Sequence, residues 1–386
     1  RAGLKTVLAP IGTYVPAIDI IIKKGIIRGQ ESNGMLCAFS ELGLNGDSDG
    51  IIELPDDAPL GTSYIEYADL NDPVIEIAIT PNRGDCLGVR GIARDLSAAS
   101  IGRMKPLDTS ECKGEFDSPI HWALSPDAVE IVPRVTGRYF QDVANKSSPE
   151  WMARRLISIG QRPISALVDI TNYIMIDLGR PLHAFDADKI RGDTLFIRRA
   201  NAGEKILALN EKEYECTPDM LVIGDRDGAD DIAGIMGGER TGITDDTQNL
   251  FLEIAIFDPI SVAATGRTLN INSDARYRFE RGLDGESPDL LSGYIARFVQ
   301  SICGGKISRE VSVGAGVAWQ RCVYFNPELT QQLTGIELAH PQQRQILNEL
   351  GFIIEPGEDK TWNVTPPAWR NDIDGQADLV EEISRV

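Results

Sequence analysis

Short apolar segments separated by turn-forming residues occupy the first part of the chain. The segments KTVLAP, IDIIIKKGII, GMLCAF and GIIELP alternate with Gly, Pro, Asn and Asp. Segments of this length and composition are typical of β-strands. The pattern predicts a small β-barrel or sandwich in residues 1–72.

The pattern changes in residues 73–108. An apolar strand is predicted over residues 74–79, and a Pro-Asn-Arg-Gly turn then leads into a helix that Asp85 could cap. We expect the inward-facing residues of this helix to be Leu87, Ile92, Ala93 and Leu96. This stretch should therefore form a small strand–helix segment.

Helical and strand patterns mix in residues 128–308. Ser148 and Pro149 predict a helix start and Gly160 its stop, and a second helix should end at Gly179. The predicted strands that follow are DTLFIRRA, KILALN, EYEC, MLVIGD and NLFLEIAIF. This mixture indicates an α+β domain.

Residues 318–386 show a third pattern. A helix is expected from Pro341 to Leu350, stopped by Gly351. The segment FIIEPGEDKTWNV predicts a hairpin with Pro356-Gly357 in its turn, and another helix should start near Asp374. The chain as a whole is thus predicted to be a multidomain α+β protein.

Composition narrows the classes of function. The 386 residues are 42% apolar and 25% charged, as in soluble globular proteins, and the net charge is −20. Because bulk phosphate binding needs a broad excess of Lys and Arg, any contact with nucleic acid must be local. The sequence has no signal peptide and no stretch near 18 uninterrupted apolar residues, so it indicates neither secretion nor membrane insertion.

The six cysteines are scattered, without a CxxC pair or a histidine cluster that would complete a zinc site. We expect free, reduced thiols in a cytoplasmic protein. These cysteines are Cys37, Cys86, Cys112, Cys216, Cys303 and Cys322. Since the chain starts at Arg1 without Met and stops at Val386 inside a helical pattern, we expect a fragment of a longer protein.

Candidate chemistry begins at His183, one of only three histidines. A lone histidine after a helix stop is more often structural than catalytic. The segment AGIMGGERTG could bring backbone N–H groups to a ligand, or it could simply form a tight turn. Glu253 interrupts the apolar strand NLFLEIAIF, where it either needs a polar partner or ligand or occupies an exposed alternate position.

Two further segments combine small or charged residues. Ser273 and Ala275 leave room for a bulky group, and the neighbouring arginines suit either phosphate or internal ion pairs with nearby acids. Those arginines are Arg276, Arg278 and Arg281. In residues 372–382 the acids either sit near a helix dipole or surround a hard cation such as Mg²⁺. The acids are Asp372, Asp378, Glu381 and Glu382.

Taken together and in order, these motifs resemble the β subunit of bacterial phenylalanyl-tRNA synthetases. GQESNGMLCAFSELGL is similar to the family's oligonucleotide-binding (OB-like) tRNA module, truncated at its N-terminus, and ITPNRGDCLGVRGIARDL to the small B1-type segment. The B3/B4 domain is represented by VDITNYIMIDLGRPLHAFD, AGIMGG, FLEIAIFDP and SDARYRFERGLD. PPAWRNDI and DLVEEI resemble the winged-helix-like B5 domain, truncated at its C-terminus. Ser273 and Arg276 stand where many relatives have Thr and Ser.

The resemblance implies that the B3/B4 domain edits, hydrolysing tyrosine wrongly attached to tRNA(Phe). It implies that Glu253 accepts the tyrosine hydroxyl, that Ala275 leaves room for the ring, and that His183 and Thr171 place the attacking water. The other residues of the implied editing pocket are Pro181, Gly237 and Ser273.

The resemblance also implies partners and cofactors. These are an α subunit that carries the ATP-dependent activation of phenylalanine, in a heterotetramer of two α and two β subunits, and tRNA(Phe). A Mg²⁺ site shared with the α subunit would use Asp372, Asp378, Glu381 and Glu382. Two alternatives remain open: an RNA-binding scaffold with an inert pocket, and a free-standing metal-dependent hydrolase using the same acids.

Overall fold

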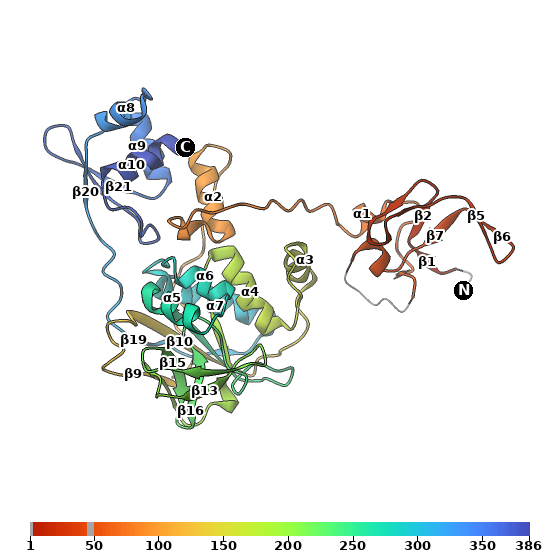
Figure 1. Ribbon diagram of the computed structural model, residues 1–386, viewed down its shortest axis with the longest axis horizontal. Coiled ribbons are helices and arrows are strands. Elements are labelled where there is room, and N and C mark those ends of the chain that lie inside the picture. The colour runs from red at the N-terminus through yellow and green to blue at the C-terminus, as the bar shows by residue number, and fades with distance from the viewer. Residues whose placement is uncertain (1–2, 45–49) are drawn as a thin grey trace. The chain divides into compact units, whose positions relative to one another are not determined.

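The computed structural model describes residues 3–44 and 50–386. It divides into two compact units, one of residues 1–76 with 157–162 and the other of residues 77–156 with 163–386. Figure 1 labels many of the helices and strands of each unit. Residues 1, 2 and 45–49 of the predicted N-terminal module lie outside the described residues.

The first unit is built from very short strands, as its sequence pattern predicts. These pair two by two, β1 with β8, β2 with β7, β3 with β4 and β5 with β6, so its described residues form no closed barrel. Ladders of two or three residues are too short to continue from one pair to the next. The elements are β1 (Lys5–Thr6), β2 (Leu8–Pro10), β3 (Tyr14–Val15), β4 (Ile20–Ile21), β5 (Gly25–Ile27), β6 (Gln30–Ser32), β7 (Gly34–Leu36), β8 (Glu53–Leu54) and α1 (Tyr64–Tyr67).

The predicted strand over residues 74–79 is wrong. Residues 71–80 carry no strand, and Val74, Ile75 and Ile77 are exposed, since an extended segment becomes a strand only beside a pairing neighbour. Helix α2 (Val89–Ala98) does follow, but Gly88 takes the N-cap position.

Two details of the predicted α2 also differ from the structure. Asp85 does not cap the helix, because its carboxylate forms ion pairs with Arg83 and Arg94. Leu96, expected to face inward, is exposed.

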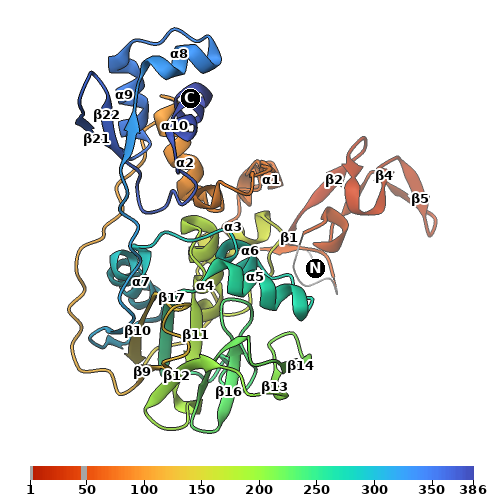
Figure 2. The ribbon, with the colours of Figure 1, turned by 60° about the vertical axis from the view of Figure 1, so that its left-hand side comes forward.

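Two sheets organise the middle of the second unit. The first has the order β11-β17-β10-β18, with β19 also pairing with β10, and all its pairs are antiparallel. Its strands are β10 (Arg134–Gln141), β11 (His183–Asp186), β17 (Leu250–Ile256), β18 (Lys306–Ile307) and β19 (Val311–Val313). Figure 2 shows β10, β11 and β17 side by side.

The second sheet has the order β16-β15-β12-β9, and a separate hairpin pairs β13 with β14. The strands are β9 (His121–Leu124), β12 (Thr194–Arg199), β13 (Glu204–Leu207), β14 (Glu213–Cys216), β15 (Leu221–Asp225) and β16 (Gly228–Ile232). The strand predictions are confirmed in that each predicted segment overlaps an observed strand, but β9 and β16 were not predicted.

Strand β17 separates two hydrophobic cores. Leu252 and Ile254 pack with helices on one face, whereas Phe251 and Ala255 pack with the second sheet on the other. Because side chains alternate along a strand, Glu253 shares the face of Phe251 and Ala255. The sequence alternation thus directs this carboxyl group into the interior.

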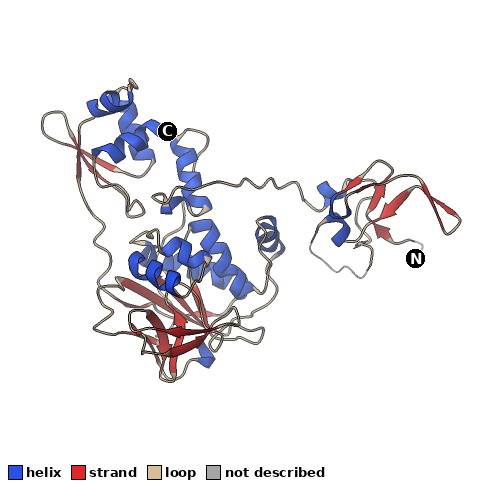
Figure 3. Ribbon diagram, in the orientation of Figure 1, coloured by secondary structure: helices blue, strands red, loops and turns tan. Residues whose placement is uncertain are grey.

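Helices cover these sheets, as the blue and red elements in Figure 3 show. Helix α4 ends at Gly179, whose φ of 69° is the left-handed conformation that glycine adopts readily. Ser148, expected to cap α3, donates a hydrogen bond to Asp169. The helices are α3 (Glu150–Ser158), α4 (Ala166–Leu178), α5 (Pro259–Thr268), α6 (Asp274–Phe279) and α7 (Ser287–Cys303).

The C-terminal section forms a three-stranded sheet with three helices. The predicted hairpin is confirmed, although its turn spans residues 357–361 and Pro356 ends the first strand. The elements are β20 (Val323–Phe325), α8 (Glu328–Thr334), α9 (His340–Glu349), β21 (Ile353–Pro356), β22 (Trp362–Thr365) and α10 (Gln376–Arg385). Within the described residues, no helix has the length and apolar character needed to cross a membrane.

Candidate functional site

A cavity of about 400 Å³ opens among α4, the start of β11, the glycine-rich segment after β16, β17 and α6. The tertiary structure brings together here every residue expected to form the editing pocket. They are Thr171, Pro181, His183, Gly237, Glu253, Ser273 and Ala275. Their roles in a reaction stay predictions, but their convergence on one cavity is a property of the fold.

The ladder between β11 and β17 brings the two most chemically versatile side chains together. His183 is the first residue of β11 and lies directly opposite Glu253 in the antiparallel register. Residues opposite each other in such a ladder project from the same face of the sheet. His183 and Glu253 therefore share the cavity although 70 positions separate them in the chain.

The imidazole of His183 is confined on two sides. Its ring meets Phe185 edge to face, with ring centroids 4.4 Å apart. A Cβ atom placed on Gly237 would lie only 2.2 Å from Cε1 of His183. The glycine at position 237 is thus required by the space that the imidazole occupies. Gly234, with a φ of 71°, lies three residues before it.

We expect Gly237→Ala to displace the His183 ring and to lower the free energy of unfolding by about 1–3 kcal/mol, because the added methyl group overpacks the site. Thermal denaturation and the NMR signals of the His183 ring measure the two effects. Gly102→Ala is the matched control, since a Cβ atom there meets nothing within 4 Å. An unshifted His183 signal at wild-type stability would contradict this expectation.

Three buried polar atoms around the cavity have no hydrogen-bond partner among the described residues. They are Nε2 of His183, Oδ2 of Asp231 and Oε2 of Glu253. The first two lie 3.2 Å apart, within ion-pair distance but outside the angles of a hydrogen bond. Since buried polar groups cost free energy when unpaired, this cavity is suited to a polar ligand or water.

Sequence analysis missed Asp231. The signal was available, because two adjacent acids, Asp230 and Asp231, end an otherwise strand-like segment just before the glycine-rich motif. Both are buried.

Burial sets the protonation of the cavity. It raises the pKa of Glu253 to about 8, against the opposing effect of Arg180, and lowers the pKa of His183 to about 4. Burial and the neighbouring Asp230 raise the pKa of Asp231 well above its usual range. Because 22% of the His183 side chain is exposed, solvent weakens this lowering of its pKa. At neutral pH the cavity therefore offers mainly uncharged groups that can donate and accept hydrogen bonds.

Ser273 and two of the arginines near α6 make local contacts. Ser273 caps α6 by accepting from the Arg276 amide and donates to the Ile235 carbonyl, which ties the helix to the glycine-rich segment. Arg276 pairs with Glu280 and Arg278 with Asp274. Of the two alternatives that the sequence offers for these arginines, phosphate binding or internal ion pairs, the contacts of Arg276 and Arg278 match the ion pairs.

Among the described residues, no three of the four acids of residues 372–382 come close enough together to hold a cation. Asp372 accepts two 2.8 Å hydrogen bonds from Arg370, and Glu382 is buried between Arg370 and Arg385. Asp378 accepts from two backbone amides at the start of α10, as an acid in the first turn of a helix does, and Glu381 is exposed.

These acids do not fit a Mg²⁺ site in the chain by itself, because arginines and backbone amides occupy oxygen atoms of Asp372, Asp378 and Glu382. In residues 3–44 and 50–386, the acid and thiol groups close enough to hold a cation are those of Asp85, Cys86 and Asp95 alone. Arg83 and Arg94 already pair with Asp85.

Glu382→Gln should lower the free energy of unfolding by about 3 kcal/mol or more, because it removes a charge that two arginines share in the interior. Millimolar Mg²⁺ should leave the melting temperature of the wild-type chain unchanged. The exposed Glu381→Gln variant is the control, expected to melt like wild type. A Mg²⁺-dependent rise in melting temperature that Glu382→Gln abolishes would show that a cation site forms after all.

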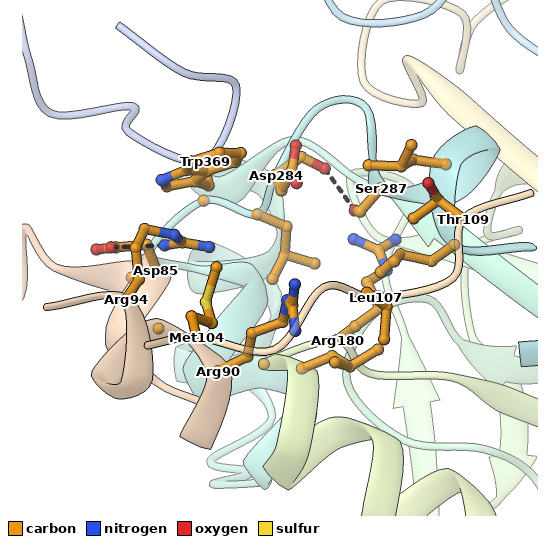
Figure 4. A pocket seen from close by; sticks show the side chains of 18 residues that line it. Asp85, Arg90, Arg94, Met104, Leu107, Thr109, Arg180, Asp284, Ser287 and Trp369 are labelled. Atoms are coloured by element: carbon orange, nitrogen blue, oxygen red, sulfur yellow. Dashed lines mark hydrogen bonds and ion pairs between the residues drawn. The ribbon is translucent and has the colours of Figure 1, made fainter. Parts of the chain in front are cut away.

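A second cavity of about 200 Å³ lies between α2, the end of α4 and the segment leading into α7. Figure 4 shows Arg90, Arg94 and Arg180 around it, with Arg94 facing the ring of Trp369. Arg180 is 2% exposed, and its positive charge also opposes the rise in the pKa of Glu253. Sequence analysis gave Arg180 no role, although it adjoins Pro181 of the first cavity.

Two family models match parts of the chain. Residues 131–304 match the model of the B3/4 domain, and residues 323–386 match that of the tRNA synthetase B5 domain. A solved N-terminal fragment of the phenylalanyl-tRNA synthetase β-subunit from Pyrococcus horikoshii is a more distant likeness, with a TM-score of 0.40 and 16% identity over 79% of this chain and 84% of that one.

Curated relatives match along the whole chain. The phenylalanine–tRNA ligase β subunits of Cereibacter sphaeroides and Mesorhizobium japonicum are 49% and 47% identical to it, in each case over 100% of this chain and 47% or 48% of the relative. That of Ruegeria pomeroyi is 48% identical over 100% of this chain and 48% of its own length. The chain spans about half the length of these relatives, and it belongs to the family of phenylalanine–tRNA ligase β subunits.

Proposed function

We propose that the B3/4 domain of this chain hydrolyses tyrosine wrongly esterified to tRNA(Phe). The observation that supports this most is the 400 Å³ cavity in which Glu253 and His183 present unpartnered polar atoms beside apolar walls. Such a cavity suits an aromatic side chain that ends in a hydroxyl group.

The two ends of the cavity take different tasks in this proposal. Glu253 lies at the ring end and hydrogen-bonds the tyrosine hydroxyl, which phenylalanine lacks, while Ala275 leaves space for the ring. An aminoacylation site shaped for phenylalanine rejects tyrosine only by leaving its hydroxyl without a hydrogen-bond partner. An editing site that supplies this partner prefers tyrosine instead. With its pKa near 8, Glu253 can serve this hydroxyl as an acid or as a carboxylate.

His183 and Thr171 serve the ester end. The Thr171 hydroxyl donates to the Val168 carbonyl, which leaves its oxygen free to accept from water. The water oxygen adds to the ester carbonyl, the bond from the carbonyl carbon to the ribose oxygen breaks, and that ribose oxygen takes up a proton. Because the adjacent ribose hydroxyl can assist, positioning by His183 suffices and a strong base is not required.

We further propose that the whole protein, of which this chain spans about half, attaches phenylalanine to tRNA(Phe) with ATP and Mg²⁺ together with an α subunit, in a cytoplasmic heterotetramer of two α and two β subunits. The β-subunit names of the relatives support a partner subunit. With a net charge of −20, the contact of this chain with tRNA is local.

Deacylation tests the editing proposal. The chain, alone and reconstituted with the α subunit, is incubated with Tyr-tRNA(Phe) and with Phe-tRNA(Phe), and tyrosine should be released preferentially. Binding of tRNA without release of either amino acid would identify an inert RNA-binding scaffold. Loss of release after chelation of metal ions would instead favour a metal-dependent hydrolase.

A further inference from the structure

Asp231, the fourth residue of β16, joins the glycine-rich segment to His183. Its Oδ1 accepts a 2.7 Å hydrogen bond from the amide of Gly238, the residue after the glycine that confines the imidazole. Its Oδ2 lies 3.2 Å from Nε2 of His183. Neither of these facing atoms has a hydrogen-bond partner elsewhere in the part of the chain that the structure describes.

The charges around Asp231 favour its protonated form. Asp230 and Glu253 are the acids that act on it, and both oppose a negative charge there. Arg240 pairs with Asp225 at 2.9 Å and with Asp230 at 3.3 Å, and acts on Asp231 only from a distance. Burial to 2% exposure, two neighbouring acids and the lack of a Lys or Arg contact among the described residues all favour the protonated carboxyl group.

A buried carboxylic acid must donate its proton to an acceptor, and the unpartnered atom within reach is Nε2 of His183. A slight rotation of the ring or of the carboxyl group completes this hydrogen bond. An imidazole that accepts at Nε2 and is itself neutral carries its own proton on Nδ1. The partner on one ring nitrogen thereby decides what the other nitrogen can do.

We propose that Asp231 is a positioning residue for His183, donating a hydrogen bond to Nε2 and so fixing the imidazole proton on Nδ1. Together with Gly237 and Phe185, it holds the ring in one orientation and one tautomer. His183 then meets the ester end of the cavity as a hydrogen-bond donor, which orients the water or the ester oxygen. The consequence for catalysis rests on the proposed editing function. The assignment of the His183 tautomer does not depend on that function.

The tautomer is measured by ¹⁵N NMR of the histidine-labelled chain. The other histidines are His121 and His340, so His183→Ala assigns the signal. We expect Nδ1 to be protonated in wild type and in Asp231→Asn, because the amide replaces the acid as a donor to Nε2. Asp231→Leu should shift the proton toward Nε2, the tautomer that free imidazole side chains favour in water. A wild-type signal with the proton on Nε2 would overturn the proposal, even if no variant folded.

The effect of Asp231 on catalysis is measured by deacylation of Tyr-tRNA(Phe) by the chain reconstituted with the α subunit. Asp231→Asn should retain activity within roughly threefold of wild type, whereas Asp231→Leu should lose roughly tenfold or more. Asp227→Asn is the control, since Asp227 is exposed in the turn before β16, and it should behave like wild type.

The outcomes separate the two proposals. If the wild-type chain hydrolyses no Tyr-tRNA(Phe), the editing proposal fails and the NMR signal still decides the role of Asp231. If wild type is active and Asp231→Asn is as slow as Asp231→Leu, a carboxylate rather than an acid acts on His183, and the positioning proposal is wrong.

Discussion

Ala275→Trp should reduce hydrolysis of Tyr-tRNA(Phe) by at least about a hundredfold, because the indole fills the space proposed for the tyrosine ring and keeps the ester from its reacting position. Ala275 lies in the first turn of α6 and lines the cavity. The measurement is single-turnover deacylation by the chain reconstituted with the α subunit, with thermal denaturation alongside.

A matched substitution separates a blocked cavity from a damaged fold. Ala377→Trp places the same side chain on an exposed position of α10, away from the cavity, and should deacylate Tyr-tRNA(Phe) like wild type. Both variants should bind tRNA normally. If Ala275→Trp hydrolysed at wild-type speed, the tyrosine ring would bind somewhere other than this cavity.

Glu253→Gln should change both stability and specificity. Because the folded protein holds the pKa of Glu253 near 8, above its ordinary value of 4.5, the folded state keeps a proton that the unfolded chain releases. Stability from this group is therefore present below pH 4.5, declines as the pH rises through 8, and then stays low. Removing the ionisable group should stabilise the chain at pH 8.5 relative to pH 5 by on the order of 3 kcal/mol.

Unfolding of wild type and Glu253→Gln at the two pH values measures this change. The exposed Glu239→Gln serves as control and should show no such pH-dependent gain. An equal stability difference at pH 5 and pH 8.5 would show that Glu253 does not keep its proton in the folded chain.

The same variant should lose roughly tenfold in preference for Tyr-tRNA(Phe) over Phe-tRNA(Phe), since the amide is a weaker partner for the hydroxyl than an acid or carboxylate. His183→Ala provides the contrast, because His183 serves the ester end. It should slow both substrates and leave their ratio near that of wild type. If His183→Ala changed the ratio of Tyr-tRNA(Phe) to Phe-tRNA(Phe) hydrolysis and Glu253→Gln did not, the roles assigned to His183 and Glu253 at the two ends of the cavity would have to be exchanged.

Local sequence information predicts several helices and strands of the second unit. The alternation of NLFLEIAIF predicts β17 and places Glu253 on the interior face, because side-chain direction in a strand follows from backbone geometry alone. Gly179 ends α4 for a similarly local reason, its left-handed backbone. The motifs that carry the family resemblance are likewise local features of the sequence.

Tertiary structure decided which distant groups meet. The register that sets His183 opposite Glu253, and the approach of Asp231 to Nε2, depend on strand pairing that no local pattern encodes. Residues 74–79 have the alternation of a strand but no pairing neighbour, so they form none. The spacing of the acids in residues 372–382 predicts a candidate cation site, whereas it is side-chain packing that places Arg370 and Arg385 against Glu382.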